Sequence, residues 1–563
     1  MDFVLNKWWK SAIVYQIYPF SFKDSNGDGK GDLKGIIQKL PYLSKLGINV
    51  IWLNPIFESP FIDNGYDISD YYKINPILGT MNDFTMLLNK AHSLGIKIIL
   101  DLVVNHTSNE HKWFKESCKK EKNKYTNFYI WKKGKSDGSP PNNWGSTFGG
   151  SAWEYVPSRD MYYLHLFAKE QPDLNWENPV LRNSIYSMMK YWLDIGIDGF
   201  RMDVISLISK KQDFPDAPVD YPYNRSYYFG SSNGPRVHEF IREMNEKVLS
   251  KYNIMTVGET PNTTSEQALL YVGENRKELN MVFQFDHMHL DYGINGKYST
   301  THYKLNELKQ VFTEWEECMN KDGWNSLYWS NHDQPRAVTR FGNDSTYRFE
   351  SAKMLGTLLH MMKGTPFIYQ GEEIGMKNPD YKSIKEYKDV EAISSYKSLK
   401  LSGMKETKAL NILHLKARDN ARSPMQWDKS INSGFSTSKP WLKLCDDYKD
   451  VNVKNEFNEE KSVLNHYIKL IKLRKKYPVV VFGDYEIINK DDSSVYAYIR
   501  KYKNEELIVI CSLVSNNVLF RPDVGKLSTK PKLLLSNYSD SEKFLSSKVE
   551  LKPYEAMIYY INN

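Results

Sequence analysis

The strongest constraint on the fold is a repeated alternation between short apolar strands and helices that carry one apolar face. A strand at 12–18 precedes a helix at 33–46, and a strand at 48–53 precedes a helix at 82–94 and a strand at 97–104. Further strand candidates follow at 199–204, 254–259, 281–285, 326–331 and 366–370. This alternation predicts a parallel α/β fold, and the strands reach the eight that a closed (β/α)8 TIM barrel requires.

The alternation stops in two places and changes character near the C-terminus. After residue 104 it breaks for about seventy residues, and a long insertion at the carboxyl end of a barrel strand is a candidate active-site wall. A second irregular stretch is expected at about 377–430, after the eighth strand. From about 482, short alternating strands predict a separate β-sandwich.

The composition is that of a soluble globular protein, with a length that predicts roughly two to four domains. The 75 basic and 68 acidic residues leave a net charge of +7, and most lysines are interleaved with acids. We interpret this as a solvated surface, which argues against nucleic-acid binding. Residues 1–10 contain no apolar signal region, and no run of about 18 apolar residues occurs. We therefore expect neither secretion nor membrane insertion.

The cysteines predict the redox environment of the chain. Cys118, Cys318, Cys445 and Cys511 lie far apart, with neither metal-ligand spacing nor the density of a disulfide framework. We expect them to be free thiols in a reducing cytoplasm.

Three of the predicted strands end in acidic residues. Arg201 and Asp203 lie two apart on one strand and therefore project to the same side. The next strand ends in Glu259, and a later one ends in His332 and Asp333. The carboxyl ends of barrel strands meet at one rim, so these acids are crowded together, which favours one that stays ionised and another that carries a proton. Any one acid alone would be interpreted as an ion pair at the rim, but three suit glycoside hydrolysis.

The segments Gly199–Ser206, Ile254–Glu259 and Ser326–Asp333 resemble the catalytic motifs of glycoside hydrolase family 13, the α-amylase superfamily. The similarity extends from Trp8 to the C-terminal end and is nearest to oligo-1,6-glucosidases. The resemblance places a small subdomain after the third barrel strand. The domains expected are a discontinuous catalytic barrel at 1–106 and 177–481, an insertion subdomain at 107–176, and a C-terminal antiparallel β-sandwich at 482–563.

The resemblance implies a mechanism that retains anomeric configuration. Asp203 is the expected nucleophile, Glu259 the general acid/base and Asp333 the stabiliser of the oxocarbenium-like transition state. Such a mechanism predicts a carboxyl separation of roughly 5 to 5.5 Å. Arg201 is expected to lower the pKa of Asp203 and keep it charged.

The resemblance also assigns a glucose pocket. Tyr66 is expected to stack on the glucose ring. Asp63 is expected to pair with an arginine of the motif at 418–427, Arg422 in preference to Arg418, which closes the pocket beyond one sugar and makes the enzyme exo-acting. A tight turn explains the segment 63–67 without that role. By resemblance, His106 and His332 bind sugar hydroxyls, and Asp101 is an acid that supports the site from behind. Phe167 is assigned as an aromatic contact of the glucose site, and Phe148 as one of the aglycone site.

The segment 24–32 places side-chain oxygens at alternate positions, with glycines for sharp turns. It begins like an EF-hand loop, but Gly35 stands where the bidentate glutamate belongs, and an ordinary Asp-Asn-Gly turn is the alternative. Related enzymes bind a structural Ca²⁺ here, and by resemblance its ligands would be Asp24, Asn26, Asp28, the Lys30 carbonyl and Asp32. No organic cofactor is expected.

Two features bear on linkage specificity. The segment Gln171–Trp176 resembles a signature of oligo-1,6-glucosidases, and Val204 resembles enzymes that accept α-1,6 bonds, where strict α-1,4-glucosidases usually carry alanine. Thr260 departs from the methionine typical after the acid/base. We expect a monomeric, exo-acting, retaining α-glucosidase that releases glucose from isomaltose and isomalto-oligosaccharides.

Several alternative activities would use the same catalytic residues on a substrate with a different aglycone. They are those of trehalose-6-phosphate hydrolase, sucrose or isomaltulose hydrolase, and sucrose isomerase. The isomerase is disfavoured because Arg336–Arg340 lacks the charged loop motif of such enzymes. A binding domain without activity, like the ectodomains of amino-acid transporter heavy chains, is disfavoured because this chain has all three acids and no membrane anchor.

Overall fold

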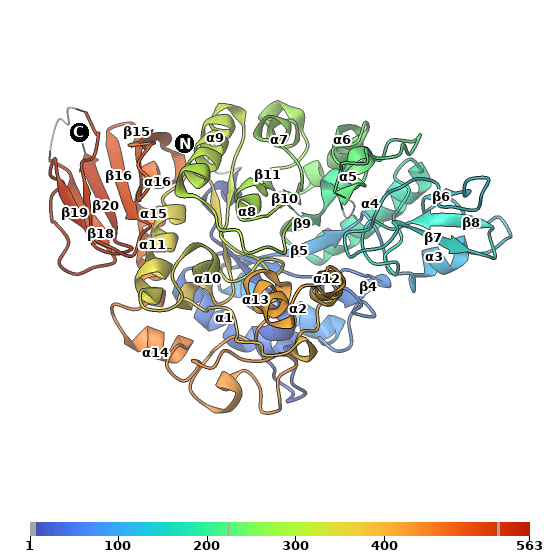
Figure 1. Cartoon of the computed structure of the whole chain (residues 1–563), viewed down its shortest axis with the longest axis horizontal. Helices are drawn as coiled ribbons and strands as arrows, with labels where there is room; N and C mark the ends of the chain where they lie inside the picture. The colour runs from blue at the N-terminus through green and yellow to red at the C-terminus, as the bar shows by residue number, and fades with distance from the viewer. Residues whose placement is uncertain (1–6, 223–224, 295, 526–529, 563) are drawn as a thin grey trace.

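The computed structural model describes residues 7–222, 225–294, 296–525 and 530–562. Residues 1–6, part of the N-terminal stretch in which no signal region was expected, lie outside these ranges. At the centre of the molecule (Figure 1) is an eight-stranded parallel sheet. Its strand order is β11-β10-β9-β5-β2-β1-β13-β12. Its strands are β1 (Val14–Ile17), β2 (Val50–Leu53), β5 (Lys97–Val103), β9 (Gly199–Asp203), β10 (Met255–Glu259), β11 (Met281–Phe283), β12 (Ser326–Leu327) and β13 (Thr365–Tyr369).

One parallel bridge between Val282 and Asn325 joins the two ends of this sheet, so the barrel is nearly closed. The prediction of a (β/α)8 barrel is confirmed. Alternate residues of each strand point inward and outward. In β2, Val50 and Trp52 pack into the barrel interior, whereas Ile51 and Leu53 pack into the cluster that includes the surrounding helices.

Helices surround the barrel, and the first illustrates how the sequence fixes their ends. Helix α1 (Leu33–Leu46) begins at Asp32, whose side chain accepts a hydrogen bond from the Gly35 N–H, and ends at Gly47, whose φ of 102° suits glycine. The other long helices are α2 (Met81–Ser93), α4 (Pro179–Ile195), α6 (Val237–Lys247), α7 (Ser265–Val272), α9 (Leu305–Asp322), α11 (Arg348–His360) and α15 (Val463–Lys476). Shorter ones are α5 (Tyr228–Ser231), α8 (Asp286–His289), α10 (Ala337–Phe341), α14 (Val453–Asn458) and α16 (Pro478–Phe482).

Two excursions follow barrel strands on the rim. A short ribbon of β3 (Phe57–Glu58) and β4 (Asp70–Ile74) follows β2. Between β5 and α4 the chain forms α3 (Lys112–Ser117) and a three-stranded antiparallel sheet in the order β6-β8-β7, which lies at the right of Figure 1. Its strands are β6 (Trp131–Lys132), β7 (Trp153–Val156) and β8 (Met161–Leu164).

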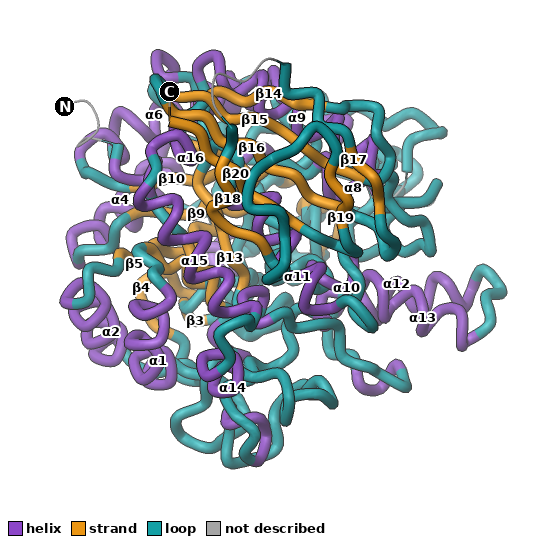
Figure 2. Tube along the Cα trace, turned by 90° about the vertical axis from the view of Figure 1, so that its left-hand side faces the viewer, coloured by secondary structure: helices purple, strands orange, loops and turns teal. Residues whose placement is uncertain are grey.

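The stretch 377–430 contains two helices, α12 (Val390–Leu401) and α13 (Glu406–Lys416), which project to one side in Figure 2. The expectation that this stretch is irregular is wrong for these segments. The pattern of α12 is uninformative because Ala392 is its single buried residue, so no apolar stripe marks the helical period.

The C-terminal domain is a five-stranded antiparallel sheet in the order β14-β15-β16-β20-β18, with a two-stranded ribbon of β17 and β19. Phe520 and Val549 of the ribbon share an apolar cluster with Ile508 and Ile510 of the sheet. The other face packs on the barrel, where the Tyr498 hydroxyl donates to the Leu358 carbonyl at 2.7 Å. The strands are β14 (Asp484–Ile488), β15 (Val495–Tyr502), β16 (Glu505–Ser512), β17 (Val518–Phe520), β18 (Lys532–Ser536), β19 (Val549–Leu551) and β20 (Ala556–Asn562).

In the described part of the chain, no helix has the length and apolar character needed to cross a membrane. The four cysteines are free.

Candidate active site

A cavity of about 640 Å³ opens at the carboxyl ends of the barrel strands. Asp203 ends β9, Glu259 ends β10, and Asp333 follows β12. Of the residues that the sequence assigned to substrate or catalysis, those lining this cavity are Asp63, Tyr66, His106, Phe148, Phe167, Asp203, Val204, Glu259, Asp333 and Arg418. Arg201, His332 and Arg422 contact these residues from behind the cavity surface.

Arg201 holds the two acids expected to carry the chemistry. Its Nη1 lies 2.8 Å from Asp203 Oδ1 and 2.7 Å from Asp101 Oδ1, and its Nη2 lies 2.6 Å from Glu259 Oε2. The guanidinium is buried and packs over the ring of Trp52. One rigid planar group therefore fixes the relative position of both carboxyls.

Glu259 is oriented by a second donor. The Val204 N–H donates to Glu259 Oε2 at 3.0 Å, so both Arg201 and Val204 engage the same oxygen and Oε1 is the oxygen available to carry a proton. Val204 adopts the left-handed backbone conformation, with φ 35°, which is unfavourable for a β-branched residue. Such strain is typical of positions that the surrounding structure holds for a functional reason.

The charge state of Asp203 differs from the expectation. Burial raises the pKa of Asp203 well above its ordinary value, the carboxylates of Glu259 and Asp101 add to this effect, and Arg201 opposes it. Arg201 lowers the pKa of Asp203 as expected, but the prediction that it keeps this carboxyl charged is wrong, because burial outweighs it. The carboxyls crowded in this buried site disfavour the ionised form of Asp203.

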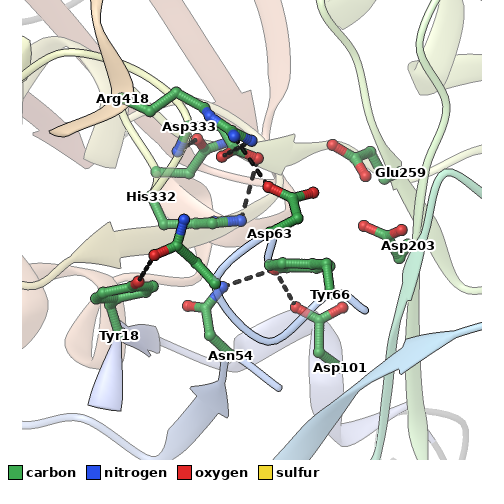
Figure 3. A network of polar contacts seen from close by, with 12 residues as sticks. Tyr18, Asn54, Asp63, Tyr66, Asp101, Asp203, Glu259, His332, Asp333 and Arg418 are labelled. Carbon is green, nitrogen blue, oxygen red and sulfur yellow. Dashed lines mark hydrogen bonds and ion pairs between the residues drawn. The ribbon is translucent and has the colours of Figure 1, made fainter. Parts of the chain in front are cut away.

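Tyr66, His332 and Asp333 form a layered network on the other side of the cavity (Figure 3). The ring of Tyr66 stacks on that of His332, with centroids 5.1 Å apart, and its hydroxyl donates to Asp101 Oδ2 at 2.7 Å. His332 Nε2 lies 3.1 Å from Asp333 Oδ2. These contacts hold Tyr66 and Asp333 in fixed positions at the cavity surface.

Asp333 is the acid that stays ionised. Burial alone would raise its pKa, but His332, Arg418 and Arg422 together outweigh burial and bring the pKa of Asp333 well below its ordinary value. Of the three acids, Asp203 and Asp333 thus have pKa values displaced in opposite directions, as crowding predicted.

The expected partner of Asp63 was Arg422, and this is wrong. Arg418 Nη2 lies 2.9 Å from Asp63 Oδ1. Arg422 donates through Nε to the His332 carbonyl at 2.9 Å, which directs its Nη2 to Asp333 at 2.7 Å. Both arginines also contact Asp333, but Arg418 is the one that pairs with Asp63.

Aromatic side chains complete the wall near His106. The rings of Phe167 and His106 are 5.1 Å apart, and Phe148 packs against Phe167 and under the guanidinium of Arg418. Burial lowers the pKa of His106, so its imidazole is neutral at physiological pH. Gln171 Nε2 lies within hydrogen-bond distance of Asp63 Oδ2 and His106 Nε2, which links the Gln171–Trp176 signature to the pocket.

Sequence reasoning missed several residues of this site. Asp389 is buried and contacts both Arg418 and Arg422. Lys297 and Glu391 form an ion pair of 2.9 Å at the cavity, and Arg225 lines it without having been identified. Of these missed residues, only Asp389 could have been noticed in the sequence, because an aspartate directly before a helix is typical of an N-cap.

The loop at 24–32 is closed by its own hydrogen bonds. Asp24 accepts from the N–H groups of Asn26, Gly27 and Gly29, and Asp32 caps α1. In the described part of the chain, no three acidic, His or Cys side chains are grouped so as to hold a metal ion. The geometry of this loop therefore gives no evidence for a bound Ca²⁺, and the calcium ion stays a prediction.

Comparisons with known proteins agree with this architecture. The family model for the α-amylase catalytic domain matches residues 16–483. The oligo-1,6-glucosidase of Bacillus cereus is 52% identical over 554 residues, covering 98% of this chain and 99% of that enzyme. Two solved structures have TM-scores of 0.94: the trehalose-6-phosphate hydrolase of Bacillus licheniformis, 48% identical over 99% of this chain and 100% of its own, and the isomaltulose synthase of Protaminobacter rubrum, 39% identical with the same coverage.

Proposed function

The chain belongs to the α-amylase family, glycoside hydrolase family 13, and from that premise we propose that it is a retaining, exo-acting α-glucosidase acting on isomaltose and isomalto-oligosaccharides. It releases glucose from the non-reducing end by cleaving α-1,6 bonds. The observation that carries the proposal is the pair of carboxyls, Asp203 and Glu259, held on one guanidinium at the cavity.

The chemistry follows from this pair. The ionised carboxylate of Asp203 attacks the anomeric carbon, and the bond to the glycosidic oxygen breaks as the protonated carboxyl of Glu259 gives its proton to that oxygen. Water then attacks the glucosyl ester and gives a proton back to Glu259, which releases glucose and restores Asp203. Asp333 stays charged and binds sugar hydroxyls as positive charge develops on the ring.

Exo-action is supported by the ion pair of Asp63 and Arg418. Both side chains line the cavity, and Asp389 binds Arg418 from behind. Breaking a buried pair of this kind costs about 3–5 kcal/mol, so it forms a firm end wall for a single sugar.

The α-1,6 preference is supported by the 52% identity to oligo-1,6-glucosidases and by Val204, which lines the cavity directly after Asp203. Thr260, which departs from the typical methionine, is buried, and its hydroxyl donates to the Phe283 carbonyl at 3.2 Å. This side chain supports the wall from behind and is not among the lining residues. The alternative with the most specific support is trehalose-6-phosphate hydrolysis, the activity of the 48% identical solved structure.

The test is glucose release by the purified protein from isomaltose, maltose, sucrose and trehalose 6-phosphate, with Asp203→Asn as control. Isomaltose should be cleaved with the highest kcat/KM, and the variant should be inactive. Preferred cleavage of another substrate would overturn the α-1,6 assignment, and an active variant would overturn the assignment of the nucleophile.

Three finer properties are part of the proposal. The enzyme acts as a monomer, which size-exclusion chromatography with light scattering tests against the chain mass of 65.8 kDa. It works in the cytoplasm, consistent with four free cysteines. Calcium bound by the loop at 24–32 stabilises the fold and takes no part in the reaction.

A further inference from the structure

A row of buried polar side chains runs behind the glucose pocket and ends at the ring of His332. Its members are Asp101, Tyr66, Asn54, Gln16 and His332, and each is hydrogen-bonded to the next. None of the five residues is more than 5% exposed. Buried polar groups form their hydrogen bonds with one another, so each donor of this row must meet an acceptor. The direction of every hydrogen bond in the row therefore follows once one member is fixed.

Asp101 fixes this direction, because its carboxylate can only accept. Arg201 Nη1 donates to Asp101 Oδ1 at 2.7 Å, and the indole Nε1 of Trp52 donates to Oδ2 at 3.1 Å. Both of these groups are donors only, and Arg201 forms an ion pair with the carboxylate. The hydroxyl of Tyr66 lies 2.7 Å from Asp101 Oδ2, so it gives its single proton to that oxygen.

The direction then passes from Tyr66 to His332. Having given its proton to Asp101, the Tyr66 hydroxyl accepts from Asn54 Nδ2 at 2.7 Å (Figure 3). The other end of that amide, Asn54 Oδ1, is therefore the acceptor for Gln16 Nε2 at 2.8 Å. The Nε2 of Gln16 carries a second proton, and it lies 2.9 Å from His332 Nδ1. Nδ1 of His332 must therefore accept.

The other ring nitrogen of His332 is left as a donor without a partner. A neutral imidazole whose Nδ1 accepts carries its proton on Nε2. His332 Nε2 lies 3.1 Å from Asp333 Oδ2, but its N–H points past that oxygen, and the buried atom has no hydrogen-bond partner among the residues that the structure describes. Native proteins rarely leave a buried donor unpaired, so this one is kept for a group that arrives with the substrate.

We propose that Gln16 is a positioning residue of the glucose site. It sets the tautomer of His332, so that Nε2–H donates to a sugar hydroxyl while that hydroxyl donates to the carboxylate of Asp333. The assignment of the sugar hydroxyl rests on the proposed function, whereas the position of the proton on His332 does not depend on any substrate.

This tautomer suits a hydroxyl that meets both groups. The hydroxyl oxygen accepts from His332 Nε2–H while its own proton points to Asp333, so each of the three groups has a partner. With the proton on Nδ1 instead, the lone pair of Nε2 and the Asp333 carboxylate would both need a donor, and one hydroxyl has a single proton. The tautomer therefore decides how firmly the sugar is held to Asp333 as positive charge develops on the ring.

The first experiment locates the proton by nitrogen NMR of protein labelled at the histidine ring nitrogens, with the His332 signals assigned by their absence in His332→Gln. In the wild type near neutral pH, Nε2 should be protonated and Nδ1 should not. Gln16→Met removes both donors at similar size and should give a mixture of the two tautomers. Gln16→Glu places an acceptor against Nδ1, which should gain a proton. A wild type with its proton on Nδ1, or the wild-type signals in Gln16→Glu, would overturn the proposal.

The matched control is Gln284→Met. Gln284 is also buried, and its Nε2 lies 2.6 Å from Nδ1 of another histidine, His287, outside the cavity lining. It therefore removes the same kind of contact away from the substrate, and the His332 signals should not change.

The second experiment measures kcat and KM on isomaltose, with Tm recorded for each variant. Gln16→Met should lose about tenfold in kcat, the value of one hydrogen bond, while KM changes less than about threefold, because the contact strengthens in the transition state. Gln284→Met should keep its kcat within about threefold at a similar loss of Tm. A wild-type kcat in Gln16→Met would refute the positioning role. A wild type inactive on isomaltose would sink the proposed function and leave the NMR result standing.

Discussion

Replacing Asp389 by alanine tests whether a residue that meets no substrate positions the glucose site. Oδ1 contacts Arg418 and lies 3.2 Å from Arg422 Nη1. Oδ2 accepts from Arg418 Nε at 3.0 Å and from the Ala392 N–H at 3.1 Å, so it also caps α12. The side chain has no exposed surface. Asp389→Ala therefore removes the shared partner of two buried arginines and the cap of a helix that borders the cavity.

The magnitude follows from these contacts. Removing one partner of a buried ion pair costs about 3–5 kcal/mol, and losing an N-cap costs about 1 kcal/mol. Asp63 and Asp333 still neutralise part of the arginine charge, so we expect a loss near the lower end, about 3–4 kcal/mol of unfolding free energy. Released from Asp389, Arg418 and Arg422 no longer hold Asp63 and Asp333 in place, and kcat/KM should fall about a hundredfold, which corresponds to about 2.7 kcal/mol.

The assay combines urea unfolding with kinetics on isomaltose, and Glu278→Ala is the matched control. Glu278 is equally buried and paired with Arg276 at 2.9 Å, but it precedes β11 and so lies at the opposite end of the barrel. The control should lose comparable stability and keep its kcat. If Asp389→Ala retained kcat/KM within about threefold of the wild type while losing the same stability, the positioning role would be refuted.

The stability effect should also depend on pH. Burial opposes ionisation of Asp389, but Arg418 and Arg422 outweigh it and lower the pKa of Asp389 below 3.8. A depressed folded-state pKa contributes stability above the unfolded-state pKa, and this contribution disappears as the pH falls through the folded-state value. The difference in stability between the wild type and Asp389→Asn should therefore be constant near neutral pH and shrink below about pH 4.

Three further predictions concern the nucleophile, the linkage and the calcium loop. Asp203→Asn should lower kcat on isomaltose by about a thousandfold or more, since no covalent intermediate forms, and a variant within tenfold of the wild type by stopped assay would contradict this. Val204→Ala should raise the ratio of maltose to isomaltose kcat/KM by about tenfold, within the 1–3 kcal/mol expected of such a change in side-chain bulk, and an unchanged ratio would remove Val204 from the determinants of linkage. Adding millimolar Ca²⁺ to protein treated with a chelator should raise Tm, because an ion that binds only the folded state stabilises it, and an unchanged Tm would remove calcium from the loop at 24–32.

The barrel could be predicted from sequence because its signals are local. Each strand is a short apolar run and each helix, such as α1, has its own apolar face and end signals. The acids could be predicted for the same reason, since Asp203 and Glu259 end such runs and parallel strand ends share a rim. Helix α12 could not, because it has a single buried residue and hence no periodic pattern.

What the sequence determined by itself is therefore the barrel, the three acids at its rim and the family that they resemble. The tertiary structure alone decided that Arg418 rather than Arg422 meets Asp63 and that burial outweighs Arg201 at Asp203. The physical reason is distance along the chain: Asp63 and Arg418 are 355 residues apart, so no local pattern relates them. The strands bring these charged side chains together only in the folded barrel. Folding therefore decides which of them form ion pairs and how strongly burial shifts their pKa values.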